Sequence, residues 1–151
     1  MLFAVALLLI GIAFGSALTL QLFVIPPLMA RVQDRSTVTR VSNESLKQHH
    51  TFSVLLLLPA TILFYFAGHI PALALSSILL LLNLYQRFWV FTKLHLVKQP
   101  IGVQDLIQPD NVLREEFNRL QRRVYTLFRI HWLLLLINLL VAAFFSTQSR
   151  A

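Results

Sequence analysis

Five histidines are the side chains of this sequence best suited to metal or proton chemistry. Imidazole is the commonest metal ligand in proteins, and its charge can change near neutral pH. His49, His50, His95 and His131 lie beside basic segments, whereas His69 lies apart from them. No two of the five have the H-x-x-x-H or H-E-x-x-H spacing that holds two ligands on one helical face. The first four are candidate ligands of a metal ion or haem, and the alternative is that they only pack at helix ends.

Two pairs of polar side chains interrupt apolar stretches at helical spacing. Asn83 and Arg87 are four residues apart, and His131 and Asn138 are seven apart, so each pair shares a helical face. In a membrane such groups hydrogen-bond a neighbouring helix, each bond contributing about 1 kcal/mol. They are interpreted first as interhelical hydrogen-bonding groups. The alternatives are a binding site between the two pairs and a path for a small solute along this face.

Recognisable catalytic motifs are missing. Paired carboxylates, a nucleophile elbow, a phosphate-binding glycine loop and a dinucleotide fingerprint do not occur. The absence of cysteine excludes disulfides, thiolate metal sites, iron–sulfur clusters and cysteine nucleophiles. The apolar stretches also lack the carboxylate or base that proton-coupled transporters generally use. We therefore assign no catalytic residue, and the sequence favours a protein without enzymatic activity.

The elements that position these residues follow from the distribution of charge. Twelve of the 13 Lys and Arg residues lie within 31–47 and 87–129, and the rest of the chain is almost free of charge. A helix needs about 20 apolar residues to cross a bilayer. With 57% hydrophobic residues in 151, the chain is predicted to be one integral membrane domain. Its net charge of +7 is explained by membrane orientation, and no nucleic-acid partner is expected.

An all-α, four-helix membrane bundle is predicted. Its spans cover about residues 2–27, 51–68, 71–93 and 130–147. The second and third spans form a hairpin through the Gly68–Pro71 turn, Pro26 and Pro27 end or kink the first span, and Pro59 kinks the second.

The final helix is predicted to be unusually long. Apolar residues recur every three or four positions before the last span, which indicates one helix from about 111 to 146 that begins after an N-cap at Asp110. Its first half would stand in the cytoplasm. Residues 98–109, which hold two prolines and a glycine, are predicted to be a loop.

The basic connections predict the orientation. The cytoplasmic loops 31–50 and 94–129 are basic, whereas the turn at 68–71 carries no Lys or Arg. Four crossings put both loops on one side, which the positive-inside rule identifies as the cytoplasm. Both termini then face outward, and the expected location is a bacterial-type inner membrane.

The first span also carries a possible contact surface for a second helix. Gly11 and Gly15 form a G-x-x-x-G pair, a pattern that allows two membrane helices to approach closely. The pair predicts a homodimer or contact with another membrane protein, and the alternative is two glycines that a membrane helix tolerates.

Two stretches resemble a known family. They are Gly15 to Val32, GSALTLQLFVIPPLMARV, and Phe117 to Leu140, FNRLQRRVYTLFRIHWLLLLINLL. They are similar to the transmembrane-protein-205-like family, also called domain of unknown function 4149. The matching positions are Phe23, Val24, Pro26 or Pro27, Leu28, His131, Asn138 and Leu139. The chain departs from the family in its aromatic residue before the histidine, which is Phe128, three positions ahead.

A weaker resemblance is to the anthrone-oxygenase-like small membrane proteins, whose Asn-Val-Pro-Leu-Asn element is absent here. The first resemblance implies a four-helix membrane protein without an assigned biochemical activity. It adds nothing about cofactors or substrates.

The functional prediction is a small accessory, assembly or stress-tolerance component that acts through helix–helix contacts in the bilayer; its cofactor is unknown, and none is predicted. The alternative from another class is a metal- or haem-dependent membrane oxidoreductase, with His131 as the first candidate ligand and His49, His50 or His95 as partners. A third is small-solute permeation along Asn83, Arg87 and Asn138.

Overall fold

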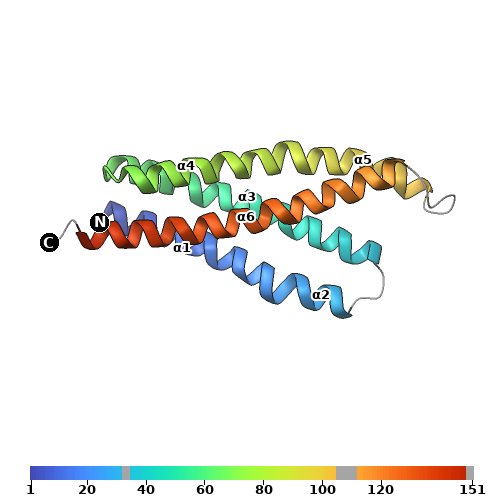
Figure 1. Ribbon diagram of the computed structural model, residues 1–151, viewed down its shortest axis with the longest axis horizontal. Coiled ribbons are helices and arrows are strands. Elements are labelled where there is room, and N and C mark those ends of the chain that lie inside the picture. The colour runs from blue at the N-terminus through green and yellow to red at the C-terminus, as the bar shows by residue number, and fades with distance from the viewer. Residues whose placement is uncertain (32–34, 105–111, 149–151) are drawn as a thin grey trace.

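Helices make up nearly all of the computed structural model, which describes residues 1–31, 35–104 and 112–148 (Figure 1). No strand occurs in these ranges. The α-helices are α1 (Leu2–Thr19), α2 (Ile25–Arg31), α3 (Arg35–Phe66), α4 (Ile70–Tyr85), α5 (Phe91–Gln104) and α6 (Val112–Gln148), and two π-helical turns are η1 (Leu20–Val24) and η2 (Gln86–Val90). The turns join α1 to α2 and α4 to α5 without a break, so the chain forms four long rods.

Each rod contains a helical segment that is long and apolar enough to cross a membrane. In the described part of the chain these segments are Leu2–Leu28, Thr37–Phe66, Ile70–Val97 and Arg114–Phe144. They contain or overlap the four predicted spans, and they extend beyond the apolar stretches at the basic end. The predicted all-α class and the number of long apolar helices are confirmed.

The hairpin turn between α3 and α4 forms where it was predicted. Gly68 has a φ of +68°, a backbone conformation that glycine adopts without the steric cost of a Cβ. The next residue, His69, caps α4, because its Nδ1 accepts a hydrogen bond of 3.3 Å from the backbone N–H of Ala72. Pro71 follows in the first turn of α4, where its missing N–H has no helical partner to lose.

The proline pair of the first rod does not end the helix. A π-helical turn at Leu20–Val24 precedes it, and α2 then continues to Arg31. Because α2 starts at Ile25, Pro26 and Pro27 fall within its first turn, where proline is tolerated.

The predicted loop 31–50 is largely helical, which corrects the sequence interpretation. The helix α3 begins at Arg35, and it buries Val38, Ser42, Leu46 and His49. This spacing of three or four residues is that of an amphipathic helix whose charged side chains occupy the opposite face. The basic side chains of this segment led to the prediction of a loop, whereas the three- and four-residue spacing of its buried side chains is that of a helix.

The second predicted loop, 94–129, is also mostly helical. The helix α5 runs to Gln104, so the predicted loop 98–109 is wrong over 98–104, while 105–109 and the N-cap Asp110 lie outside the described residues. The prediction of one continuous final helix is confirmed by α6, Val112–Gln148.

The rods pack side by side around a common core. The helix α1 contacts α3 and α6, α4 contacts the same two helices, and α5 extends along α6. Small residues on α1 allow close packing, since Ala6, Ala13 and Ala17 are fully buried there. Figure 1 shows that α1 begins, α3 turns into α4 and α6 finishes at the same end of the molecule.

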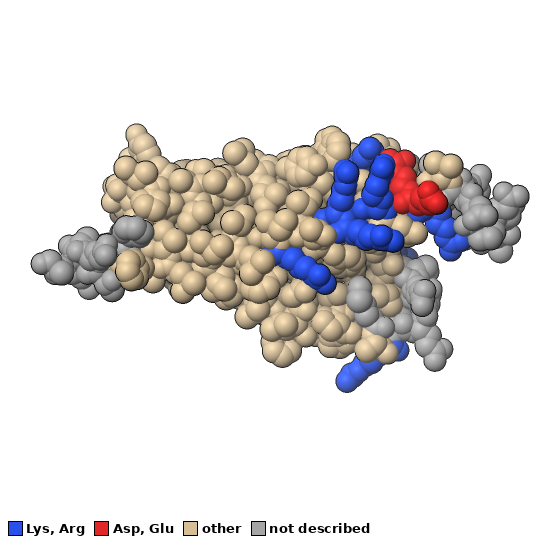
Figure 2. Space-filling model, viewed as in Figure 1, with Lys and Arg blue, Asp and Glu red and all other residues tan. Residues whose placement is uncertain are grey.

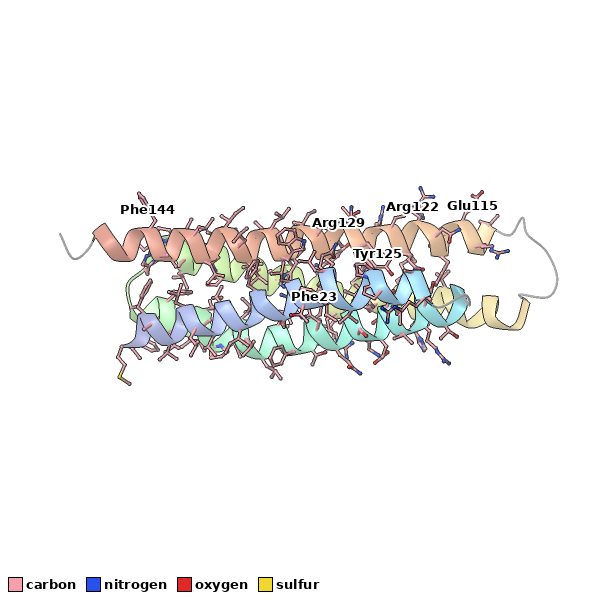
Figure 3. The ribbon with its side chains drawn as sticks, turned by 90° about the horizontal axis from the view of Figure 1, so that it is seen from below. Phe23, Glu115, Arg122, Tyr125, Arg129 and Phe144 are labelled. Carbon is pink, nitrogen blue, oxygen red and sulfur yellow. The ribbon has the colours of Figure 1, made fainter. Side chains whose placement is uncertain are left out.

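Charged side chains lie toward one end of the described molecule, whereas large apolar side chains are exposed along most of its length. Large apolar side chains point outward along the rods, such as Leu55, Leu81 and Leu140, with exposures of 67%, 67% and 61%. Charged side chains gather toward the end opposite the α3–α4 turn, where the basic segments lie (Figure 2). Figure 3 shows the same order along α6, from Phe144 through Arg129 and Arg122 to Glu115.

Candidate functional site: a buried histidine cluster

Three histidines from two helices meet in the core. We call His49 and His50 of α3, His131 of α6 and Asn83 of α4 the histidine cluster. Their side chains are buried, with exposures of 5% for His49 and 0% for the other three. The centroids of the three rings lie 5.6–5.9 Å from one another. The structure therefore brings together three of the four histidines proposed as ligands.

Asn83 links two of the rings through its amide. Its Nδ2 donates to the carbonyl oxygen of Leu79 at 3.1 Å, which fixes the orientation of the amide. The second Nδ2 hydrogen points to His131 Nδ1 at 3.2 Å, and Oδ1 faces His50 Nδ1 at 2.6 Å. His50 must then donate from Nδ1, whereas His131 must accept at Nδ1. One asparagine thus imposes opposite tautomers on two neighbouring histidines.

The third ring is held by two serines. Ser16 of α1 donates its hydroxyl hydrogen to the carbonyl oxygen of Ala13 at 2.9 Å, so its oxygen accepts from His49 Nδ1 at 3.3 Å. Ser53 of α3 donates to His49 Nε2 at 3.1 Å. Both nitrogens of His49 are therefore occupied, and the network ties α1 to α3.

Two nitrogens of the cluster lack a partner. His50 Nε2 and His131 Nε2 are buried, and neither has a hydrogen bond within the described residues. The tautomers set by Asn83 make the first a free acceptor and the second a free N–H donor. A buried polar atom without a partner costs about 1–3 kcal/mol. The cluster therefore offers one acceptor and one donor, on rings 5.6 Å apart, to a bound molecule.

Aromatic rings pack against the cluster, and a buried amide lies on the same rod as Asn83. Phe128 packs edge-on against His49 and His50, with centroid distances of 5.5 and 6.0 Å. Phe91 lies 5.7 Å from His50. Gln86, in η2, donates to the carbonyl oxygen of Leu127 at 3.4 Å, and its Oε1 is buried without a partner in the part of the chain that the structure describes.

This arrangement offers few ligands to a metal ion. Among the described residues, no group of three or more His, Asp or Glu side chains is placed to hold one. Both ring nitrogens of His49 are hydrogen-bonded, and the unpartnered Nε2 of His131 carries a hydrogen. The lone pair of His50 Nε2 is therefore the one histidine lone pair of the cluster that could bind a metal ion. The fourth candidate, His95, lies exposed on α5 and takes no part in the cluster. The geometry does not favour His131 as the first metal ligand.

The two predicted polar pairs have different surroundings. Asn83 is buried in the cluster, but Arg87 lies toward the surface and donates from Nε to Thr51 Oγ1 at 2.9 Å. His131 and Asn138 both point into the core, at 0% exposure. Neither amide atom of Asn138 has a partner within the described residues. Fully buried Leu79 and Leu135 lie one helical turn from Asn83 and Asn138, and the solute path along these residues stays a prediction.

The glycine pair of α1 has open space at its Cα atoms within the described part of the chain. A Cβ added at Gly11 or Gly15 would meet nothing within 4 Å. The close approach between α1 and its neighbours involves Ala13 and Ala17 instead, which are fully buried.

Sequence reasoning did not assign roles to Ser16, Ser53 or Gln86. The available signal was the helical spacing of Leu46, His49 and Ser53, which lie on the same buried face of α3. The partners across the cluster could not be read from spacing, because Asn83 lies 33 residues from His50 and 48 from His131.

Comparisons of this chain with protein-family models, curated proteins and solved structures find no match. The resemblance to the transmembrane-protein-205-like family therefore stays a prediction based on residues 15–32 and 117–140. Function has to be inferred from the side chains of this chain itself.

Proposed function

We propose that this chain is an integral membrane protein with four crossings, forming a four-helix bundle with its basic end in the cytoplasm. The long uncharged part of the molecule, over which large apolar side chains are exposed, carries this proposal (Figure 2). Large exposed side chains such as Leu8, Leu58 and Ile78 have no core to enter, and a lipid environment accounts for them. A bacterial-type inner membrane, with both termini outward, is the proposed location.

The absence of cysteine allows a clean test of this topology, because a single introduced thiol is the only one that can be labelled. Glu44→Cys lies on the exposed face of α3, and Ala67→Cys lies in the turn between α3 and α4. With a membrane-impermeant maleimide, Ala67→Cys should react in intact cells and Glu44→Cys only after permeabilisation. Reaction of both from the same side of intact cells would exclude four crossings.

The proposed role is that of an accessory, assembly or stress-tolerance component that acts through helix contacts. The open edge at Gly11 and Gly15 supports this role, because a Cβ added at either glycine would meet no atom of a neighbouring helix within 4 Å among the described residues. A second copy or another membrane helix can approach such an edge closely. Cross-linking in membranes should capture a dimer that is lost when both glycines are replaced by Leu. The matched control replaces Val5 and Ile12, which are exposed on α1 about a quarter turn away from the glycines, by Leu. Detection of monomer alone would contradict the proposed dimer.

A second candidate function is ligand binding or redox chemistry at the histidine cluster. The unpartnered Nε2 atoms of His50 and His131 favour it, since buried polar atoms normally have partners. A metal ion or haem at this site would be bound by the lone pair of His50. Purified protein would then contain stoichiometric metal or show a haem absorption band, and His50→Ala should abolish either signal. Protein free of both, from cells supplied with iron, copper and zinc, would exclude the metal and haem alternative.

A further inference from the structure

A groove lies on the charged half of the molecule, apart from the histidine cluster. Its volume is about 920 Å³, and it runs along the first half of α6 beside the end of α4. Its lining includes Tyr85, Glu116, Arg119, Arg122, Arg123 and Thr126. Three of these residues are arginines from consecutive turns of α6.

Among the described residues, two of the three arginines have no acidic partner. Glu116 lies 3.5 Å from Lys93 and 4.0 Å from Arg119, so its charge is shared between these two cations. Arg122 and Arg123 have no carboxylate within 4.0 Å among the described residues. The groove is thus lined by two arginines without a carboxylate partner in the described ranges, together with Tyr85 and Thr126, whose side chains carry hydroxyl groups.

The groove lies at the border between the charged and apolar parts of α6. After Arg129 the sequence has no charged residue before Arg150, and Figure 3 shows Arg122 about midway between Arg129 and Glu115. On the other wall, Tyr85 stacks on Trp89 with ring centroids 5.2 Å apart. Aromatic residues of this kind lie at the level of lipid headgroups in membrane proteins.

We propose that this groove binds the phosphodiester headgroup of an anionic membrane phospholipid. The inference rests on the proposed membrane insertion. Arg122 and Arg123 supply planar donors that match phosphate oxygens, and the hydroxyls of Tyr85 and Thr126 add single hydrogen bonds. Leu127 gives the groove an apolar edge at its membrane end, where the acyl chains begin. Basic pockets on the cytoplasmic side of membrane helices recognise anionic headgroups in this way.

The position of the acidic residues agrees with this orientation. Glu115 and Glu116, which both line the groove, lie six to eight residues before Arg122 and Arg123, roughly 9–12 Å farther from the apolar segment along the helix. A phosphate at the arginines is therefore kept away from both carboxylates. The net positive charge at the membrane end of the groove selects phosphatidylglycerol over a zwitterionic lipid.

The test uses full-length protein in nanodiscs of phosphatidylcholine, to which phosphatidylglycerol, phosphatidylethanolamine or soluble glycerol phosphate is added. Bound lipid is counted by native mass spectrometry. The variant Arg122→Gln/Arg123→Gln is compared with Arg114→Gln/Arg129→Gln, which removes the same charge from exposed positions of α6 outside the groove. The groove variant should bind phosphatidylglycerol at least roughly tenfold more weakly than the parent, and the control should change less than about threefold.

The possible outcomes test the headgroup site and the four membrane crossings separately. Equal loss in both variants, or parent protein that prefers neither phosphatidylglycerol nor any other phospholipid, would overturn the headgroup site. Equal retention of phosphatidylethanolamine would overturn its selectivity for anionic lipid, and competition by glycerol phosphate alone would show a soluble phosphate site instead. A chain that does not enter nanodiscs would contradict the proposed four crossings, whereas an inserted chain without lipid preference would contradict the groove alone.

Discussion

Two asparagines, one on α4 and one on α6, are equally buried but differ in their hydrogen bonds. Asn83 connects His50, His131 and the carbonyl of Leu79, whereas neither amide atom of Asn138 has a partner in the described part of the chain. Both side chains have 0% exposure. Burial alone therefore does not distinguish them, and the difference lies in what the facing helices present at each level.

The comparison shows where the helices are tied together. At the level of Asn83, two helices present imidazoles that an amide can bridge. At the level of Asn138, seven residues along α6 from His131, fully buried Leu135 and Ala142 flank the amide on its own helix. An amide in apolar surroundings without a partner costs several kcal/mol in hydrocarbon. We infer that Asn83 stabilises the packed helices, whereas Asn138 weakens them unless a bound molecule reaches it.

The largest effect is expected from Asn83→Leu. This substitution keeps the approximate volume but leaves His50 Nδ1 and His131 Nδ1 without partners. Two orphaned buried nitrogens should lower the free energy of unfolding by about 3 kcal/mol. The midpoint of thermal unfolding in detergent would fall accordingly. A midpoint equal to that of the parent would show that the amide bridge does not form.

Asn138→Leu is the matched counterpart and should change stability in the opposite direction. Removing two unpartnered amide atoms and filling their space with a methyl-bearing side chain should raise the free energy of unfolding by about 1–2 kcal/mol. The same unfolding assay measures it. Destabilisation comparable to that of Asn83→Leu would mean that Asn138 has a partner, and would remove the contrast between the two sites.

A smaller effect is expected from Ser53→Ala, which deletes the donor to His49 Nε2. The loss of one buried hydrogen bond should lower the free energy of unfolding by about 1 kcal/mol. Thr61→Ala provides the control, since that hydroxyl only donates to the carbonyl of Leu57 one turn earlier in the same helix. If the two variants unfolded at the same temperature, the hydrogen bond from Ser53 to His49 would not contribute to stability.

The smallest effect is expected from Arg87→Gln, which tests the outer half of the predicted Asn83–Arg87 pair. Its guanidinium makes an exposed hydrogen bond to Thr51, so the free energy of unfolding should change by about 0.5 kcal/mol or less. If Arg87→Gln lowered the free energy of unfolding as much as Asn83→Leu, Arg87 would stabilise the histidine cluster, contrary to its position toward the surface.

Several elements could be predicted from the sequence because their signals are local. The charge-free stretches predict the long apolar helices, the Gly68–Pro71 segment predicts a turn, and the spacing of apolar residues in 113–131 predicts the first half of α6. The first half of α3 could not be predicted from charge, because basic residues alternate there with the buried positions Val38, Ser42 and Leu46.

The histidine cluster could be predicted only in part. Spacing places His131 and Asn138 on one helical face, and it identifies the histidines as residues of interest. Their convergence depends on the rotation and axial register of α3, α4 and α6 relative to one another. These quantities arise from packing around Phe128, Leu79 and Leu57, and no single helix encodes them.

The tautomers of His50 and His131 test the central claim most directly. Protein labelled with ¹⁵N-histidine in lipid bilayers can be studied by nuclear magnetic resonance, with His50→Gln and His131→Gln used to assign the signals. Because the Asn83 amide bridges the two rings, we predict a hydrogen on Nδ1 of His50 and on Nε2 of His131. The same tautomer at both histidines, unchanged in Asn83→Leu, would contradict the account.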